Sequence, residues 1–293
     1  MTTRAPAADK TWAKRTPSPE LAPVTNAVWP FKSVPVSIFS TFGSLFMART
    51  LTLFSILCHN KAKRELRREK KMSQAETDNL PVLQLDVISD VICPWCFIGK
   101  RKLDAALAAL EGVQINLMWR PYQLYPDTPM EGADLSAKIK ERYGEDGVKQ
   151  MRENIKAAAK GTHINFAFEN IKITPNTLNA HRLIRWAAST GQQHAIAEAL
   201  FSAHFEQGKN IGDVAVLLEI AGQQGLDVPL MADLFKGDND VEATRNDDAA
   251  ARELGVHGVP AFLAGGKFLL MGAQEPEYLN RFIEKARQKL AVQ

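Results

Sequence analysis

Residues 82–98 of the chain, VLQLDVISDVICPWCFI, decide the fold. The first seven, Val82 to Ile88, are mostly apolar, which predicts a buried strand. The motif Cys93-Pro94-Trp95-Cys96 follows. A helix is expected directly after it, because apolar residues then recur at helical spacing, at Leu103, Leu107 and Leu110. The two cysteines are therefore expected where a strand ends and a helix begins.

A second strand is predicted downstream of this helix. Apolar residues occupy every other position there, at Val113, Ile115, Leu117 and Trp119. A strand, a helix and a strand within about 40 residues form a βαβ unit, whose two strands are expected to be parallel.

The remaining residues predict a helical block and a hairpin. Apolar side chains three and four positions apart indicate helices over about residues 130–235, and Asn176 and Thr177 are helix-start residues. A strand pattern returns at Ala261–Ala264, and Gly265-Gly266 predicts a tight turn into a further strand. A last helix is expected near the C-terminus. The predicted fold class is α/β, in the order βαβ, inserted helices, ββα.

Composition separates residues 1–80 from residues 81–293. Residues 1–71 hold 13 basic and 4 acidic side chains, whereas the remainder holds 23 basic and 29 acidic ones. We interpret residues 1–80 as a disordered or targeting extension, or as an over-long gene start with Met72 as the true initiator. A membrane span before Cys58 is a third interpretation, but Arg49 within it would cost about 2.5–3.5 kcal/mol. The acidic remainder gives no sign of a nucleic-acid-binding surface.

The cysteines are few and closely spaced. The chain has three, and only Cys93 and Cys96 follow Cys58. A secreted domain held together by disulfides would have more of them at wider spacing. The expected location is therefore cytoplasmic, or organellar if the N-terminal extension is a targeting segment.

The position of Cys93 favours redox chemistry. Backbone N–H groups at the start of a helix are unpaired within the helix, and the helix dipole adds about half a positive charge there. Both stabilise a thiolate, so Cys93 is the predicted attacking sulfur and Cys96 the resolving one. Pro94 suits the first helical position, and Trp95 is expected to shield the pair. The alternative interpretations of the motif are half of a zinc site and two inert buried thiols. No metal is expected, because a zinc site needs four ligands and the chain has no second pair of closely spaced cysteines.

A second feature, Gly255-Val256-His257-Gly258-Val259-Pro260, precedes the predicted third strand. Its simplest interpretation is a proline at the first position of a strand, where no N–H is needed. His257 is a candidate for tuning the thiolate, or an exposed loop residue. His181 shares a predicted helix with Leu183 and Ile184, and we interpret it as a structural residue.

These features together resemble the DsbA-like thioredoxin superfamily over about residues 82–290, and more narrowly its FrnE branch, related to the 2-hydroxychromene-2-carboxylate isomerases. The resemblance rests on the following segments: Cys93-Pro94-Trp95-Cys96 after Ser89-Asp90, Trp119-Arg120-Pro121, Asn176-Thr177, Ala180-His181-Arg182-Leu183, Gly258-Val259-Pro260 and Gly272-Ala273-Gln274.

The resemblance implies a thioredoxin fold with inserted helices and a cis peptide bond before Pro260, beside Cys93. Val259 would then offer strand-like hydrogen bonds to an extended substrate. The isomerase relatives, and the kappa-class glutathione transferases, tend to have serine where this chain has Cys93. That departure favours electron exchange.

The leading hypothesis is a disulfide oxidoreductase that exchanges disulfides with protein or small-molecule thiols. The alternatives are a glutathione-dependent isomerase or transferase and a non-enzymatic peptide-binding chaperone module. The expected redox group is the cysteine pair itself without a further cofactor, with glutathione as a candidate reductant. Neither a nucleic-acid partner nor a membrane is expected, and the sequence leaves the oligomeric state open.

Overall fold

The computed structural model describes residues 80–134 and 136–291, without the side chains of residues 136–143. The interpretations of residues 1–79, including the choice of Met72 as initiator, lie outside the described residues.

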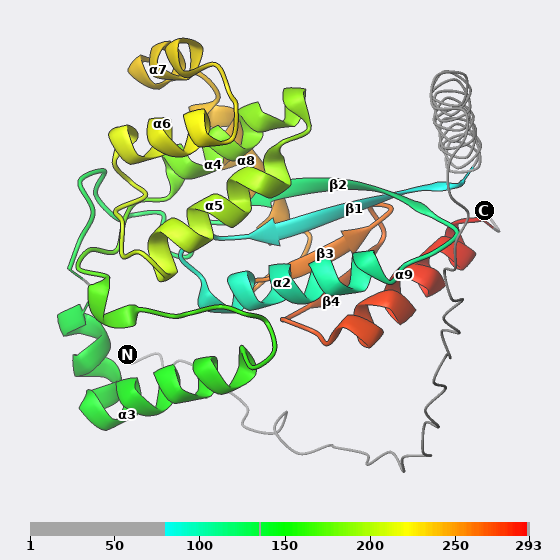
Figure 1. The fold of residues 1–293 in the computed structure, drawn as a ribbon, viewed down its shortest axis with the longest axis horizontal. Coiled ribbons are helices and arrows are strands. Elements are labelled where there is room, and N and C mark those ends of the chain that lie inside the picture. The colour runs from blue at the N-terminus through cyan, green and yellow to red at the C-terminus, as the bar shows by residue number, and fades with distance from the viewer. Residues whose placement is uncertain (1–79, 135, 292–293) are drawn as a thin grey trace, which may run out of the picture. The chain divides into compact units, whose positions relative to one another are not determined.

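A mixed sheet lies at the centre of the described part of the chain, with the strand order β2-β1-β3-β4 (Figure 1). Its strands are β1 (Val82–Ser89), β2 (Gln114–Pro121), β3 (Ala261–Ala264) and β4 (Phe268–Met271). β1 and β2 are parallel and are joined by helix α2 (Pro94–Ala108), as the βαβ pattern predicts. β3 is antiparallel to both of its neighbours, β1 and β4. The α/β fold class is confirmed.

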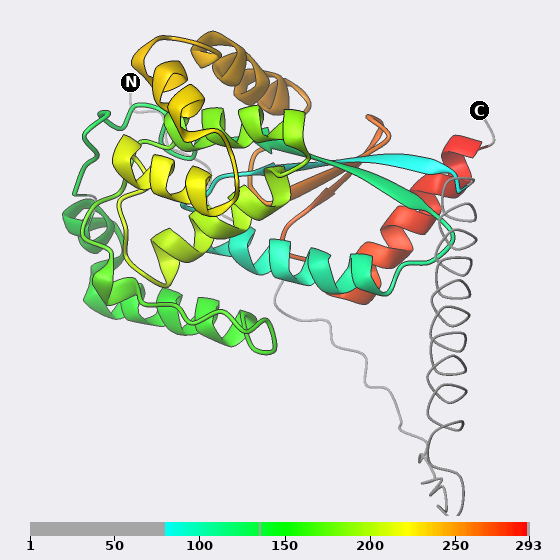
Figure 2. The ribbon, with the colours of Figure 1, turned by 45° about the horizontal axis from the view of Figure 1, so that its top comes forward.

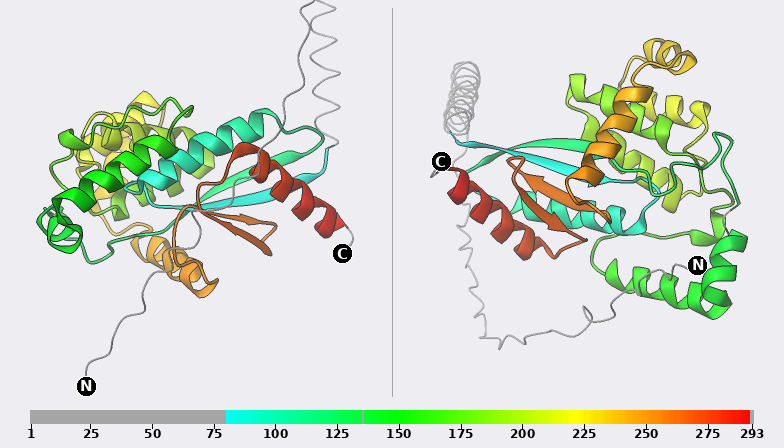
Figure 3. Two further views of the ribbon diagram at one scale, coloured as in Figure 1. Left: turned by 90° about the horizontal axis from the view of Figure 1, so that it is seen from below. Right: turned by 180° about the vertical axis from the view of Figure 1, so that it is seen from behind.

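Helices cover both faces of this sheet. α2 and α9 (Pro276–Ala291) lie on one face, and α8 (Val241–Glu253) lies on the other (Figure 3). Alternation along β1 explains the two layers, since Leu85 and Val87 enter the main core with α2 and α9. Ile88 instead packs with Ala251 of α8 in a smaller cluster.

The helical insertion follows β2 and gathers near the carboxyl ends of β1 and β2 (Figure 2). Its elements are α3 (Ser136–Ala158), η2 (Phe168–Asn170), α4 (Leu178–Trp186), η3 (Ala187–Thr190), α5 (Gln193–Phe205), α6 (Val214–Gln223) and α7 (Val228–Lys236). The apolar side chains of α3 are only partly buried, since Ile155 lies in the core whereas Met151 is 39% exposed.

Stacked phenylalanines join α2 to the insertion. The ring of Phe97 on α2 lies 5.2 Å from that of Phe201 and 6.1 Å from that of Phe205, both on α5. All three rings are buried, and such aromatic pairs stabilise a fold beyond the area they bury. This packing fixes α2, and with it the cysteine motif, against the inserted helices.

The hairpin between β3 and β4 has the predicted glycine turn. Gly265 and Gly266 have φ angles of +58° and +67°. A two-residue turn with both central φ angles positive matches the right-handed twist of its strands, and glycine adopts it without steric cost.

Candidate active site

Cys93 is the N-cap residue directly before helix α2. It has extended backbone angles, and Pro94 occupies the first helical turn. The Cys93 carbonyl accepts hydrogen bonds from the N–H groups of Cys96 and Phe97, at 3.0 and 3.3 Å. The Cys93 side chain therefore lies at the N-terminal end of α2, as the sequence predicts.

Both cysteines of the motif are free thiols and are buried, Cys93 with 5% and Cys96 with 1% of its surface exposed. The Cys93 Sγ donates toward the carbonyl oxygen of Val259, at 3.6 Å. The peptide bond between Val259 and Pro260 is cis, as the family resemblance implies. The segment before β3 and the start of α2 thus meet at the Cys93 sulfur.

Gly99 permits this close approach. A Cβ atom at position 99 would lie 2.7 Å from Cγ of Pro260, well inside van der Waals contact. Since Pro260 is itself buried, the ring has little room to move away. The glycine one turn after Cys96 therefore lets Pro260 pack directly on α2.

The thiol of Cys96 is held in its protonated form. Burial raises the pKa of Cys96 well above its usual value, and the hydrogen bond and charge of Cys93 raise it further. The Ser89 side chain and the Asp90 backbone, which both face the sulfur, act in the opposite direction and lower the pKa. Cys96 must therefore give up a proton before it can attack another sulfur.

Two candidates from the sequence are less closely tied to the thiols. Trp95 is half-buried and packs against the main core. His257 is exposed, and its Nδ1 lies 2.9 Å from the carbonyl oxygen of Gly255 in its own loop. A role for His257 in tuning the thiolate remains a prediction.

Ser89, Asp90 and His181 belong to segments of the family resemblance, but the sequence assigned no redox role to them. Ser89 is the last residue of β1, Asp90 follows it, and His181 comes from α4 of the insertion. All three are buried, and Nε2 of His181 lies 3.4 Å from Oδ1 of Asp90. The available sign in the sequence was the polar pair Ser89-Asp90 at the end of the mostly apolar stretch before the cysteine motif.

Asn176 and Thr177 connect α4 to the loop after β2. The Asn176 side chain accepts a hydrogen bond from the Leu178 N–H and donates one to the Thr128 carbonyl. The Gln123 amide donates weakly to both residues at 3.4 Å. The helix start predicted at Asn176 is confirmed, and this motif supports the loop beside Asp90.

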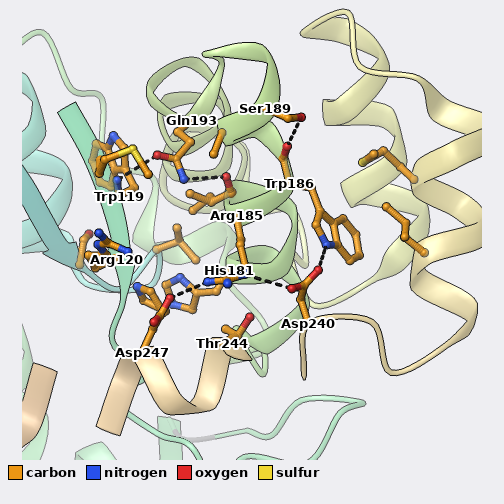
Figure 4. A pocket seen from close by; sticks show the side chains of 18 of the residues that line it. Trp119, Arg120, His181, Arg185, Trp186, Ser189, Gln193, Asp240, Thr244 and Asp247 are labelled. Atoms are coloured by element: carbon orange, nitrogen blue, oxygen red, sulfur yellow. Dashed lines mark hydrogen bonds and ion pairs between the residues drawn. The ribbon is translucent and has the colours of Figure 1, made fainter. Parts of the chain in front are cut away.

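A cavity of about 500 Å³ lies between β2, α4, α7 and α8 (Figure 4). Its lining residues include Ser89, His181, Arg185, Trp186 and Asp240. Among the described residues, no group of three or more His, Cys, Asp or Glu side chains is placed to hold a metal ion. Within the same residues, no helix is long and apolar enough to span a bilayer.

His204 on α5 makes stability depend on pH. Burial lowers the pKa of its imidazole to about 4, whereas an unfolded histidine has a pKa of about 6.5. The unfolded chain therefore binds the proton first as pH falls, and we expect about 3 kcal/mol of stability to be lost between pH ~6.5 and ~4. Urea unfolding at several pH values measures this loss. In His204→Gln the free energy of unfolding should fall by about 3 kcal/mol less over the same pH range.

The matched control for that measurement is His163→Asn. His163 is exposed and has a φ of +57°, which asparagine tolerates well. This variant should lose as much stability on acidification as the wild type. An equal loss in His204→Gln would contradict the assignment.

The sequence pattern of the DSBA-like thioredoxin domain family matches residues 84–284. The chain belongs to this family. The match covers the sheet, the cysteine motif, the insertion and most of α9. At the level of the family, it supports a thiol–disulfide oxidoreductase.

Individual proteins and solved structures are similar to this DSBA-like chain. The uncharacterized protein YwbO of Bacillus subtilis (strain 168) is 24% identical over 71% of this chain and 98% of its own length. The crystal structure of SCO1869 from Streptomyces coelicolor, described as a probable DsbA oxidoreductase, has a TM-score of 0.64 at 24% identity, covering 70% of this chain and 90% of its own. A 2-hydroxychromene-2-carboxylate isomerase has a TM-score of 0.55 at 16% identity, covering 72% and 99%.

Proposed function

We propose that this DSBA-like protein is a thiol–disulfide oxidoreductase that exchanges disulfides with protein substrates through Cys93 and Cys96. The observation that carries the proposal is the position of Cys93 at the start of α2, with its sulfur against the Val259 carbonyl and Cys96 one turn behind it. Because both residues are cysteine, the pair can carry two electrons, which a serine at position 93 would prevent.

The proposed reaction has two steps. The Cys93 thiolate, at the positive end of the α2 dipole, attacks a substrate disulfide and displaces one substrate sulfur as a thiolate. Cys96 then attacks the Cys93 sulfur and releases the second substrate sulfur. The substrate gains two electrons and the Cys93–Cys96 pair becomes a disulfide; the reverse sequence oxidises a substrate.

A polypeptide substrate suits the segment before β3. Val259 is half-buried and lies just outside β3, so its backbone is available to pair with an extended segment as an added strand. Pro94 and Trp95 would form the opposite side of this contact. The cysteine pair carries the electrons itself, and glutathione in a cytoplasmic setting is the reductant that we propose.

The wild-type protein should accelerate the reduction of insulin disulfides by dithiothreitol, followed as turbidity from the precipitating chain. In glutathione buffers the pair should titrate as a two-electron couple, with a potential of about −120 to −270 mV, measured by alkylation and mass spectrometry. The control is the rate with dithiothreitol alone. Absence of acceleration, or a pair that never forms a disulfide, would contradict the proposal.

A further inference from the structure

The cavity between β2, α4, α7 and α8 is separate from the thiol site. Among the described residues that line it, there is neither cysteine of the motif, nor Val259, nor Pro260. Its volume of about 500 Å³ falls within the range of small-molecule sites, which is roughly 300–1,000 Å³. A ligand bound in this cavity would therefore add to disulfide exchange rather than take part in it.

Most of the residues that line the cavity are apolar. The longer aliphatic and thioether side chains among them are Val91, Met118, Ile184, Leu230, Met231 and Leu234. The two methionines come from different elements, β2 and α7, and their unbranched side chains can adapt to the shape of a ligand. This wall suits a hydrophobic molecule.

The charged residues of the lining already have partners in the protein. Arg185 lies between two aspartates, with its Nε 3.2 Å from Asp240 and its Nη1 2.6 Å from Asp247 (Figure 4). The Nε of Arg120 lies 2.7 Å from Oδ1 of Asp86. A charged ligand would have to give up its hydration and compete with these ion pairs, so the lining favours a neutral ligand.

The uncharged polar groups offer little to a ligand or to water. The Gln193 side chain hydrogen-bonds to two backbone groups, and the Ser189 hydroxyl donates to a backbone carbonyl of its own turn. Three polar atoms in the lining residues lack a partner, but these atoms of Ser89, His181 and Thr244 have almost no exposed surface. Water in the cavity therefore finds few partners, and an apolar group that displaces it gains affinity.

Leu230 presents apolar surface that the fold leaves uncovered. It lines the cavity, yet 51% of its surface is exposed. It lies on α7, where Met231 is the single buried residue. A ligand that covers Leu230 removes apolar surface from water, which favours binding.

We propose that this cavity binds a neutral, largely apolar small molecule at a site independent of the cysteine pair. The apolar side chains of β2, α4 and α7 contact the ligand, and Arg185 with its two aspartates borders it. No bond is made or broken on binding. Cys93 is not required for it.

Two fluorescent probes that differ in charge test this inference on the full chain. Phenylnaphthylamine is neutral, and anilinonaphthalene sulfonate has the same rings with an added sulfonate. Both become more fluorescent in apolar surroundings. We expect saturable binding of the neutral probe, at least about 10-fold tighter than that of the sulfonate.

Leu230→Gln should weaken binding of the neutral probe by about 10-fold, because it removes one apolar side chain from the wall. The backbone N–H of Leu230 accepts no change, since it donates to the Asp227 side chain at the start of α7. The matched control is Leu254→Gln. Leu254 is 54% exposed and lies outside the cavity lining, so this variant should bind the probe like the wild type.

Ala188→Phe should abolish binding by filling the cavity. Ala188 lines the cavity and is itself exposed, so a larger side chain can occupy the site without entering the core. Ala249→Phe is the matched control, because Ala249 is exposed on α8 and lies outside the lining. It should keep the wild-type affinity.

Wild-type affinity in both Leu230→Gln and Ala188→Phe would overturn the inference, since the probe would then bind elsewhere. Tighter binding of the sulfonate, or no saturable binding at all, would overturn it as well. Cys93→Ser should bind the neutral probe like the wild type, and loss of binding there would show that the cavity belongs to the thiol site. The insulin assay measures disulfide exchange separately, so failure of this inference leaves the proposed function standing. If Ala188→Phe fails to fold, judged by circular dichroism, Leu230→Gln decides.

Discussion

Replacing Cys93 with serine should abolish disulfide exchange, and replacing Cys96 with alanine should leave the substrate attached to Cys93. A serine hydroxyl does not ionise near neutral pH and cannot form the mixed disulfide, so Cys93→Ser has no attacking group. Cys96→Ala keeps the attacking sulfur at the start of α2 but lacks the group that releases the substrate. The two variants therefore fail at different steps.

Insulin reduction and non-reducing gels distinguish these failures. Cys93→Ser should give the rate of dithiothreitol alone and no adduct. Cys96→Ala should accumulate a covalent adduct with the substrate, which dithiothreitol releases. Cys58→Ser is the control, because Cys58 lies outside the matched family domain, and it should behave like the wild type.

Three outcomes would contradict these roles. An adduct that forms in Cys93→Ser through Cys96 would reverse the assignment of attacking and resolving sulfur. Full activity of Cys96→Ala with glutathione and a small aromatic substrate would favour the isomerase or transferase alternative. Client protection that survives loss of both cysteines would favour a chaperone module.

Local patterns were sufficient to predict the part of the site that lies on consecutive residues. A buried strand, the cysteine motif and an amphipathic helix are each encoded within a few residues, and β1 and α2 follow them closely. The glycine pair before Lys267 similarly predicts the β3–β4 hairpin from backbone sterics alone. The position of Val259 beside Cys93 required the family resemblance, because 166 residues separate the two.

Contacts between distant segments could not be predicted in this way. His181 was interpreted as structural because its neighbours in α4 are apolar, and the structure adds its buried contact with Asp90. Nothing in the spacing of either residue encodes that contact, which depends on how the insertion packs over β1.

Arg182→Ala should lower the free energy of unfolding by about 4 kcal/mol, measured by urea unfolding at neutral pH. Arg182 is only 3% exposed, and its guanidinium donates to the backbone carbonyls of Leu234, Gly237 and Asn239. It also donates to the side chain of Asn179. Alanine would leave the buried Asn179 and the half-buried Leu234 without their donor, together with the carbonyls of Gly237 and Asn239 in the exposed turn.

The guanidinium closes the turn from α7 to α8, which explains an arginine in the Ala180-His181-Arg182-Leu183 segment. Arg182→Lys should recover only part of the stability, because one ammonium cannot reproduce the planar arrangement of donors. Its ring contacts, to Trp186 at 5.0 Å and Phe235 at 5.7 Å, favour the same planar cation.

Arg185→Ala is the matched control on the same helix. Arg185 pairs with Asp240 and Asp247 at the protein surface, where its side chain is 39% exposed, and surface ion pairs contribute about 1 kcal/mol or less. The two arginines lie one turn apart and carry the same charge, so the difference between the variants isolates the buried carbonyl contacts. Equal, small losses in both would show that the α7–α8 turn holds without Arg182. In that case the cavity wall formed by Met231 and Leu234 would depend on apolar packing alone.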